Sequence, residues 1–192
     1  MAMPAAQSRH WTVREVRQLI ADAPLATPRY ELVAGELLVT PSPNALHQRA
    51  VGLLLTLLET YARTNRIGVA YPSPFDIELE AESLVQPDVF VTSLQEARRL
   101  LTEMPARDVL VAVEVISPSS ARYDRVTKRA LYQRHVSEYW VVDLHARLIE
   151  RWTPNDERPE MLVDTLVWRA EGAAEPFTLE LSAYFAEVYL ER

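Results

Sequence analysis

Residues 110–116 read Leu-Val-Ala-Val-Glu-Val-Ile, a run in which one carboxylate, that of Glu114, interrupts a series of apolar side chains. Such a run is expected of a central strand that is buried on both faces of a sheet. Burial of an ionised carboxylate costs on the order of several kcal/mol unless a metal ion, a salt bridge or a raised pKa compensates. Glu114 is therefore a candidate site residue, and a structural ion pair is its alternative interpretation.

The patterns on either side of this strand predict an α/β domain. Strands are expected at residues 29–33, 36–40, 67–71, 75–79, 87–92, 109–116, 139–142, 148–152 and about 162–168. Helices are expected at about 12–22, from Leu46 to about Tyr61, at 94–101, at 120–135 and from about Ser182. Gly35 can supply the positive φ of a tight turn between the first two strands. Ser117-Pro118-Ser119 is expected to end the central strand.

The composition is that of an ordinary globular protein. The 192 residues are 48% hydrophobic and 24% charged, which is enough for one sizeable core and indicates a single domain over residues 1–192. The absence of cysteine excludes disulfides, thiolate metal sites and a cysteine nucleophile. The first residues lack the pattern of a secretory signal, and no apolar run approaches the ~18 residues that cross a bilayer. We therefore expect a cytoplasmic protein.

The charge distribution is uneven. Twenty Lys and Arg against 27 Asp and Glu give a net charge of −7, which repels nucleic acid at long range. Between Arg122 and Arg134, however, five basic residues face the single acidic residue Asp124, a local excess of four positive charges. This stretch could steer a phosphate backbone, and a solvated helix face is the alternative.

Asp88 is the second candidate site residue. It lies between Pro87 and the apolar run Val89-Phe90-Val91, although aspartate is a poor strand residue. A strand-entry residue that bonds to nearby amides is the alternative interpretation. The position of Asp88 therefore needs a reason that the sequence leaves open.

Lys128 is the third candidate. On the predicted helix after the Glu114 strand, Asp124, Lys128 and Tyr132 are spaced four apart and share one face. A strand, a short turn and a returning helix can bring Lys128 over the end of that strand. Taken alone, such a lysine would be read as a surface residue.

Asp88, Glu114 and Lys128 together supply the groups that phosphodiester hydrolysis needs. Two carboxylates can hold Mg²⁺ or Mn²⁺ while the ion keeps several water ligands. A bound divalent ion lowers the pKa of water and neutralises phosphate charge, and a lysine ammonium can stabilise the transition state. This set of groups favours metal-dependent hydrolysis.

The motifs occur in an order that resembles a known family. They are Tyr30-Glu31-Leu32-Val33-Ala34-Gly35-Glu36-Leu37, Ser42-Pro43-Asn44-Ala45-Leu46-His47-Gln48, Gln86-Pro87-Asp88, residues 113–119, Tyr123-Asp124 with Lys128 and Tyr132, and residues 138–143. This order is similar to the PD-(D/E)xK nuclease superfamily, and more narrowly to its bacterial restriction endonuclease branch. The resemblance implies a restriction-endonuclease-like mixed central β-sheet flanked by helices. It also implies Mg²⁺ or Mn²⁺ at Asp88 and Glu114, and endonuclease chemistry on DNA.

One departure from the superfamily pattern concerns the lysine. The superfamily usually places it two residues after the acidic residue, where this chain has Ile116. The resemblance implies that Lys128, on the following helix, replaces it. If Lys128 pointed away, the site could bind metal without cutting.

Two further residues are candidates of lower rank. The resemblance implies that Glu31, on the first hairpin, could add a carboxylate to the site, and pairing with a cross-strand base is the alternative. His47, at the start of the long helix, could contact a phosphate or an attacking water, although we expect a surface histidine. His10, His135 and His145 show no metal-ligand spacing.

The resulting expectation is an endonuclease in which Asp88 and Glu114 bind metal, Lys128 assists, and Lys128→Ala removes cleavage but leaves the fold. A catalytically inactive module that binds DNA or protein is the alternative, and a glycoside hydrolase with paired carboxylates is a third. A homodimer is plausible because two sites related by two-fold symmetry can cut both strands of a duplex.

Overall fold

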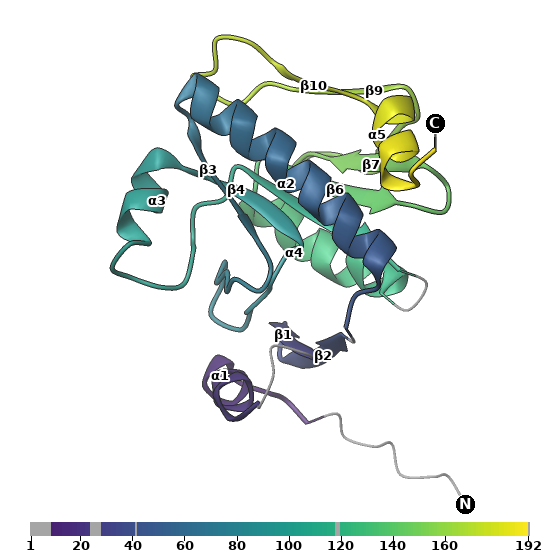
Figure 1. The fold of residues 1–192 in the computed structure, drawn as a ribbon. Helices are drawn as coiled ribbons and strands as arrows, with labels where there is room; N and C mark the ends of the chain where they lie inside the picture. The colour runs from purple at the N-terminus through teal and green to yellow at the C-terminus, as the bar shows by residue number, and fades with distance from the viewer. Residues whose placement is uncertain (1–8, 24–27, 41, 118–119, 192) are drawn as a thin grey trace, which may run out of the picture.

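The computed structural model describes residues 9–23, 28–40, 42–117 and 120–191. Its centre is a six-stranded sheet (Figure 1). The strands are, in spatial order, β3 (Gly68–Pro72), β4 (Val89–Ser93), β5 (Val111–Ile116), β6 (Glu138–Asp143), β7 (Leu148–Trp152) and β8 (Glu160–Leu162). The β5–β6 pair is parallel and the other pairs are antiparallel. The sheet is therefore mixed, as predicted.

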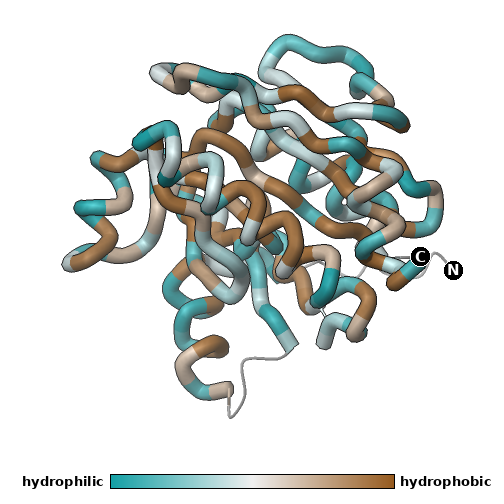
Figure 2. The backbone as a smooth tube through the Cα atoms, turned by 45° about the horizontal axis from the view of Figure 1, so that its top comes forward, coloured by the Kyte–Doolittle hydropathy of each residue, from teal (hydrophilic) through white to brown (hydrophobic). Residues whose placement is uncertain are grey.

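One face of the sheet packs against α2 (Ala45–Asn65) and the C-terminal elements. These are β9 (Thr165–Trp168), β10 (Phe177–Glu180) and α5 (Leu181–Val188). Val113 and Val115 of β5 lie in this core with Leu54 and Leu58 of α2. Hydrophobic residues are concentrated along α2 and the central strands (Figure 2).

The opposite face packs against α4 (Arg129–His135). Ala112 and Ile116 of β5 share this second core with Leu131 and Tyr132 of α4. Because side chains alternate along a strand, Glu114 lies on the α4 face between Ala112 and Ile116. The alternation of β5 thus aims its one carboxylate at the helix that follows it.

A hairpin outside the central sheet completes the site. Its strands, β1 (Arg29–Val33) and β2 (Glu36–Thr40), pair antiparallel, and Ala34 and Gly35 have φ values of 50° and 78° in the turn. Helix α1 (Val13–Asp22) begins with the predicted capping box of Thr12 and Glu15 and packs on the hairpin. These bounds confirm the predicted first helix and both strands of the hairpin.

Two of the predicted strands need correction. Residues 75–79 do not form a strand, because Ile77 bridges two different segments, at Val85 and Ala106, in place of one ladder. The strand expected at 162–168 is divided into β8 and β9 by a turn, and β10, which pairs with β9, was not predicted. Pro118 and Ser119, expected to end the central strand, lie outside the described residues.

The helix predicted at 120–135 contains an unexpected π-helical segment, η1 (Tyr123–Lys128), before α4. The Arg129 amide donates to the Asp124 carbonyl, five residues earlier. The remaining helix, α3 (Leu94–Arg99), follows β4 as predicted. π-Helical turns are rare and often occur at functional sites.

Candidate active site

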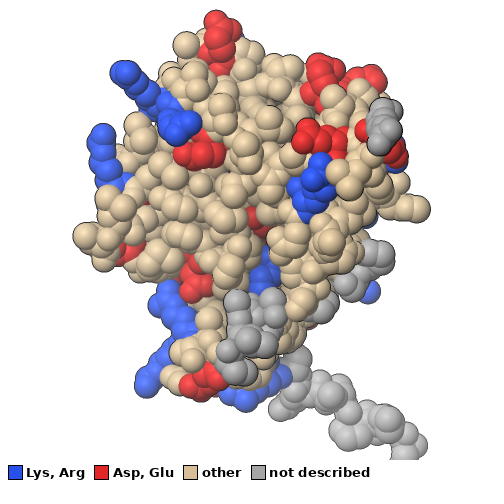
Figure 3. Space-filling view, in the orientation of Figure 1, with Lys and Arg blue, Asp and Glu red and all other residues tan. Residues whose placement is uncertain are grey.

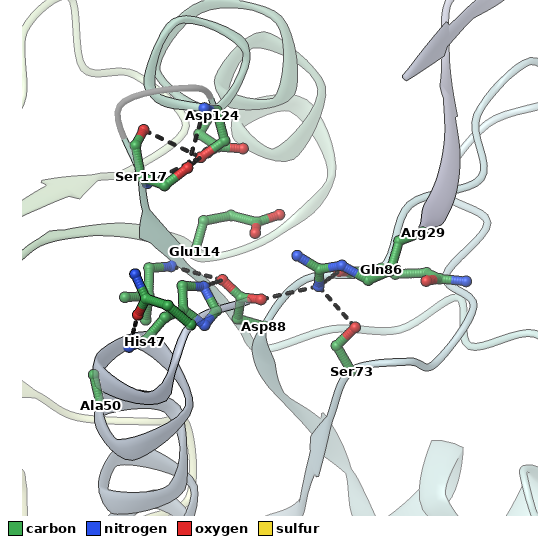
Figure 4. A network of polar contacts seen from close by, with 12 residues as sticks. Arg29, His47, Ala50, Ser73, Gln86, Asp88, Glu114, Ser117 and Asp124 are labelled. Atoms are coloured by element: carbon green, nitrogen blue, oxygen red, sulfur yellow. Dashed lines mark hydrogen bonds and ion pairs between the residues drawn. The ribbon is translucent and has the colours of Figure 1, made fainter. Parts of the chain in front are cut away.

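A cavity of about 200 Å³ brings the predicted site residues together at the ends of β4 and β5. Asp88, Glu114 and Lys128 all line it, together with Arg29 and His47. In Figure 4, Asp88 lies between His47 and Arg29, with Glu114 beside it. The sheet, the hairpin and two helices thus each contribute a side chain to one site.

The strand register explains why Asp88 and Glu114 are neighbours. Val89 of β4 pairs with Val113 of β5 in an antiparallel ladder. Continuing this register by one residue places Asp88 opposite Glu114, and residues opposite each other on antiparallel strands point to the same face. The Val115 amide donates to Asp88 Oδ2 at 2.9 Å, which holds the carboxylate at the end of the ladder.

Lys128 reaches the site, as predicted. Its Nζ lies 2.8 Å from Glu31 Oε2, 2.9 Å from Glu114 Oε1 and 3.4 Å from Asp124 Oδ1. Only 4% of its side chain is exposed, so it is not a surface lysine. Glu31 is fully buried and therefore contributes a carboxylate to the site from the hairpin.

Lys128 is also the only lysine in the sequence, because the other 19 of the 20 basic residues are arginines. Lysine is a compact point charge, whereas arginine is a planar fork that is suited to two parallel hydrogen bonds. Three carboxylates around one nitrogen match the compact ammonium better. The presence of a single lysine in the sequence could therefore have pointed to Lys128 independently of the motif spacing.

Two buried tyrosines, Tyr132 of α4 and Tyr139 of β6, support the residues around Lys128. The Tyr132 hydroxyl donates to Glu114 Oε1 at 3.3 Å, and the Tyr139 hydroxyl donates to the Asp124 carbonyl at 3.0 Å. Their rings stack with centroids 4.7 Å apart. The predicted common face of Asp124, Lys128 and Tyr132 is therefore confirmed, and it points into the site.

Asp88 has two side-chain partners that the sequence did not reveal. Arg29 Nη1 donates to Asp88 Oδ1 at 2.9 Å, and His47 Nε2 lies 3.0 Å from Asp88 Oδ2. The prediction of a surface histidine at His47 is wrong, because only 11% of its side chain is exposed. Arg29 belongs to β1 and His47 to α2, so only the tertiary fold could show these contacts.

These partners keep Asp88 ionised. Burial raises the pKa of Asp88, but the hydrogen bond and charge of His47, the charge of Arg29 and the Val115 amide outweigh it. The pKa of Asp88 is therefore below its usual value, and its carboxylate is available as an anion.

Glu114 behaves differently. Burial is the main cause that raises the pKa of Glu114 well above its usual value, and the charges of Asp124, Asp88 and Glu31 add to it against the opposing charge of Lys128. The cluster holds four carboxylates, those of Glu31, Asp88, Glu114 and Asp124, against the two cations Lys128 and Arg29. Further positive charge would favour the ionised form of Glu114.

The side chains of Asp88 and Glu114 are of the chemical type that binds a divalent cation. Asp88, directly before β4, and Glu114, in the adjacent strand β5, offer hard oxygen ligands, as Mg²⁺ prefers. The described part of the chain has no group of three or more His, Asp or Glu side chains arranged to hold a metal ion. Two carboxylates suffice for Mg²⁺, since this ion usually keeps several waters. Asp88 and Glu114 are thus the residues that would hold it.

The basic stretch between Arg122 and Arg134 does not form the free positive surface that the sequence suggested. Arg125 bonds to Asp143 and Glu150, and Arg134 bonds to Glu80. Lys128, from the same stretch, is buried in the site. On the face shown in Figure 3, acidic and basic residues are scattered without a continuous basic band. Most of the positive charge of this stretch is therefore paired with acidic residues of the same chain.

A solved structure shares this fold. The crystal structure described as a "putative nuclease belonging to DUF820" from Anabaena variabilis matches with a TM-score of 0.71 and 17% identity, over 88% of this chain and 96% of that chain. This likeness confirms the predicted nuclease-like mixed α/β fold. A search of curated proteins gives no match. Within the described residues, no helix is both long and apolar enough to cross a membrane.

A family match covers most of the sequence. The sequence profile of the Uma2 family, described as "Putative restriction endonuclease", matches residues 15–182. The matched range contains Glu31, Asp88, Glu114 and Lys128, which meet at one site. The resemblance predicted from the order of motifs is confirmed, and the chain belongs to the Uma2 family of restriction-endonuclease-like proteins.

Proposed function

We propose that the protein is a divalent-metal-dependent endonuclease that hydrolyses DNA phosphodiester bonds at the cavity of Asp88, Glu114 and Lys128. The observation that carries this proposal is the meeting of two carboxylates and a buried ammonium at the ends of adjacent strands. The family match supports nuclease chemistry. Mg²⁺ or Mn²⁺, DNA as the substrate and a homodimer are parts of the proposal.

Each side chain has a role that follows from its contacts. Asp88 and Glu114 would hold the cation, and Arg29 and His47 orient Asp88. When bound, a divalent cation supplies positive charge at the phosphate and lowers the pKa of water. Lys128 is placed to stabilise negative charge that develops on the phosphate. Its contacts with Glu31 and Asp124 hold the ammonium in position before substrate binds.

A noncatalytic nuclease-fold module that binds DNA or protein is the second candidate. One observation favours it, because the Lys128 ammonium already bonds to carboxylates on three sides. In this alternative the buried ion pairs are structural, and the site neither needs a metal nor cuts. Metal binding and cleavage separate the two functions.

The first test is cleavage of supercoiled and single-stranded DNA with Mg²⁺ or Mn²⁺ by the wild type, Asp88→Asn and Glu114→Gln, with EDTA as a control. Glu171→Gln, which alters an exposed carboxylate in a turn, is the matched variant. We expect loss of at least about 100-fold in the two site variants and none in Glu171→Gln. Equal cleavage by all four proteins would refute the site.

A second readout does not depend on activity. Protein labelled with ¹³C at lysine Cε gives one lysine signal, because Lys128 is the only lysine. We expect Mg²⁺ to shift this signal in the wild type and not in Asp88→Asn. A signal that stays unchanged in the wild type, combined with no cleavage, supports the noncatalytic module.

A further inference from the structure

A second cavity, of about 390 Å³, adjoins the candidate active site. The two cavities share the lining residues Asn44, His47 and Ser117. A group bound in the second cavity would therefore lie directly beside a phosphate bound in the first. The volume is at the lower end of the ~300–1,000 Å³ range of small-molecule sites, and it suits a single planar ring system.

The walls of the second cavity are largely apolar. Leu46, Ile116 and Leu144 line it together with the ring of Tyr189. The Tyr189 hydroxyl donates to the Leu144 carbonyl at 2.7 Å, and the Arg147 guanidinium lies 4.5 Å from the centre of its ring. Aliphatic and aromatic walls of this kind favour a flat, weakly polar group such as a nucleobase.

Polar groups at the edge of the cavity could recognise such a base. Asn44 Oδ1 accepts from the His47 amide at 2.9 Å, and within the described residues the Asn44 NH₂ group has no protein partner. His145 is exposed on the turn between β6 and β7. Asparagine amides and histidine nitrogens form hydrogen bonds with base edges. The cavity therefore combines apolar walls with a polar rim.

Because the basic residues around the site are paired, a contact with a base would contribute a larger share of the substrate binding energy. Most nucleic-acid binding energy usually comes from cations that contact phosphates. Here Arg29, Arg125 and Lys128, the basic residues that line the two cavities, are all held in ion pairs. A substrate would gain less from its backbone than is usual, so an apolar base contact can supply binding energy.

We propose that the second cavity is a nucleobase subsite that receives the base of the nucleotide beside the scissile phosphate. This inference rests on the proposed nuclease function and names its substrate class. A base can enter such a cavity only when it is unstacked. The preferred substrate is therefore a single strand, or a duplex that is opened at that nucleotide.

The experiment combines an abasic scan with a variant that fills the cavity. Leu46→Trp places a large ring in the cavity from α2, and Leu57→Trp makes the same change at an exposed site on the same helix. Single-stranded oligonucleotides with one abasic site at each position around the cut are compared by kcat/KM. In the wild type and Leu57→Trp, we expect one abasic position to lower kcat/KM about tenfold or more.

In Leu46→Trp, we expect intact DNA to be cleaved as slowly as that abasic substrate, with no further loss from the abasic site. His145→Trp narrows the cavity from an exposed turn and should give the same pattern if Leu46→Trp folds poorly. Equal cleavage of all abasic substrates by the wild type, or full activity of a folded filled variant, would overturn the subsite.

A binding measurement separates the subsite from the nuclease function. If the wild type cuts no substrate, oligonucleotides with one 2-aminopurine are bound in Ca²⁺ and their emission is compared by position. A change at one position that Leu46→Trp removes and Leu57→Trp keeps supports the subsite without cleavage. Emission that changes equally at all positions, or at none, counts against it.

Discussion

The Lys128 ammonium and the carboxylates around it depend on each other. Glu31, Glu114 and Asp124 all lie within 3.4 Å of Lys128 Nζ. Removing one partner from a buried ion pair is costly because the other charges stay buried without compensation. The expectation that Lys128→Ala leaves the fold intact therefore needs a direct test, since its loss of activity could arise from unfolding.

We predict that Lys128→Met, which keeps most of the side-chain volume, lowers the free energy of unfolding by about 3–5 kcal/mol near pH 8. Burial raises the pKa of Glu114 and the charge of Lys128 opposes this rise, so Lys128→Met raises that pKa further and the folded variant takes up a proton there at a higher pH than the wild type does. Proton uptake in the folded state stabilises it at lower pH. The loss should therefore shrink near pH 5.5, as urea unfolding at both pH values can show.

Arg122→Met is the matched control for this prediction. Arg122 is exposed at the start of η1, and its replacement should change the stability by no more than about 0.5 kcal/mol at either pH. A Lys128→Met protein with wild-type stability at pH 8 would contradict the interdependence of the cluster.

At the scale of elements, the first turn of α2 connects helix stability to the site. Asn44 caps α2 by accepting a hydrogen bond from the His47 amide, and the His47 ring contacts Asp88. Loss of the cap would loosen the turn that carries His47. A similar cap at Thr12 belongs to α1, which packs on the hairpin.

We predict that Asn44→Ala and Thr12→Ala each cost about 1 kcal/mol, or roughly 2–4 °C in Tm. Only Asn44→Ala should also lower the cleavage rate, because only α2 itself carries a residue, His47, that contacts Asp88. Asn44→Ser should recover the stability, since serine also caps helices. Equal cleavage by both alanine variants, at a temperature where both are folded, would show that the Asn44 cap does not affect the active site and would contradict this prediction.

At the scale of the whole molecule, charge pairing limits how the protein attracts DNA. The net charge is −7, and Arg125 and Arg134 of the basic stretch are held by acidic partners. Binding of single-stranded DNA that neutralises Z phosphates has a salt slope of about −0.7Z. Because few cations near the site are free, we expect the protein to neutralise only a small number of phosphates.

We predict a slope in log K against log salt concentration that is no steeper than about −2, measured by fluorescence anisotropy with a labelled single strand. Arg122→Gln should reduce this slope by about 0.7 if Arg122 contacts a phosphate, whereas Arg158→Gln, at another exposed position, should not. A slope near −4 would contradict this prediction, because it would require more free cations at the DNA-binding surface than we expect.

Much of the fold could be predicted because local patterns agree with it. The apolar run around Glu114 is strand β5, the repeat from Leu46 is α2, and the Ala34-Gly35 turn joins β1 to β2. The alternating pattern of residues 75–79 gave a wrong strand prediction. Ile77 alternates with polar neighbours as a strand residue would, but it pairs with two separate segments. Alternation reports which side chains are buried and does not specify a continuous ladder.

The sequence by itself determined the family, through the order of its motifs, and the candidates Asp88, Glu114 and Lys128. The mixed sheet followed from the resemblance to that family. Only the tertiary structure decided that Lys128 points inward, that His47 and Arg29 hold Asp88, and that most of the basic stretch is paired. The physical reason is distance along the chain. His47 and Asp88 are brought to 3.0 Å by packing of α2 on the sheet, and no local pattern encodes a contact between residues so far apart in sequence.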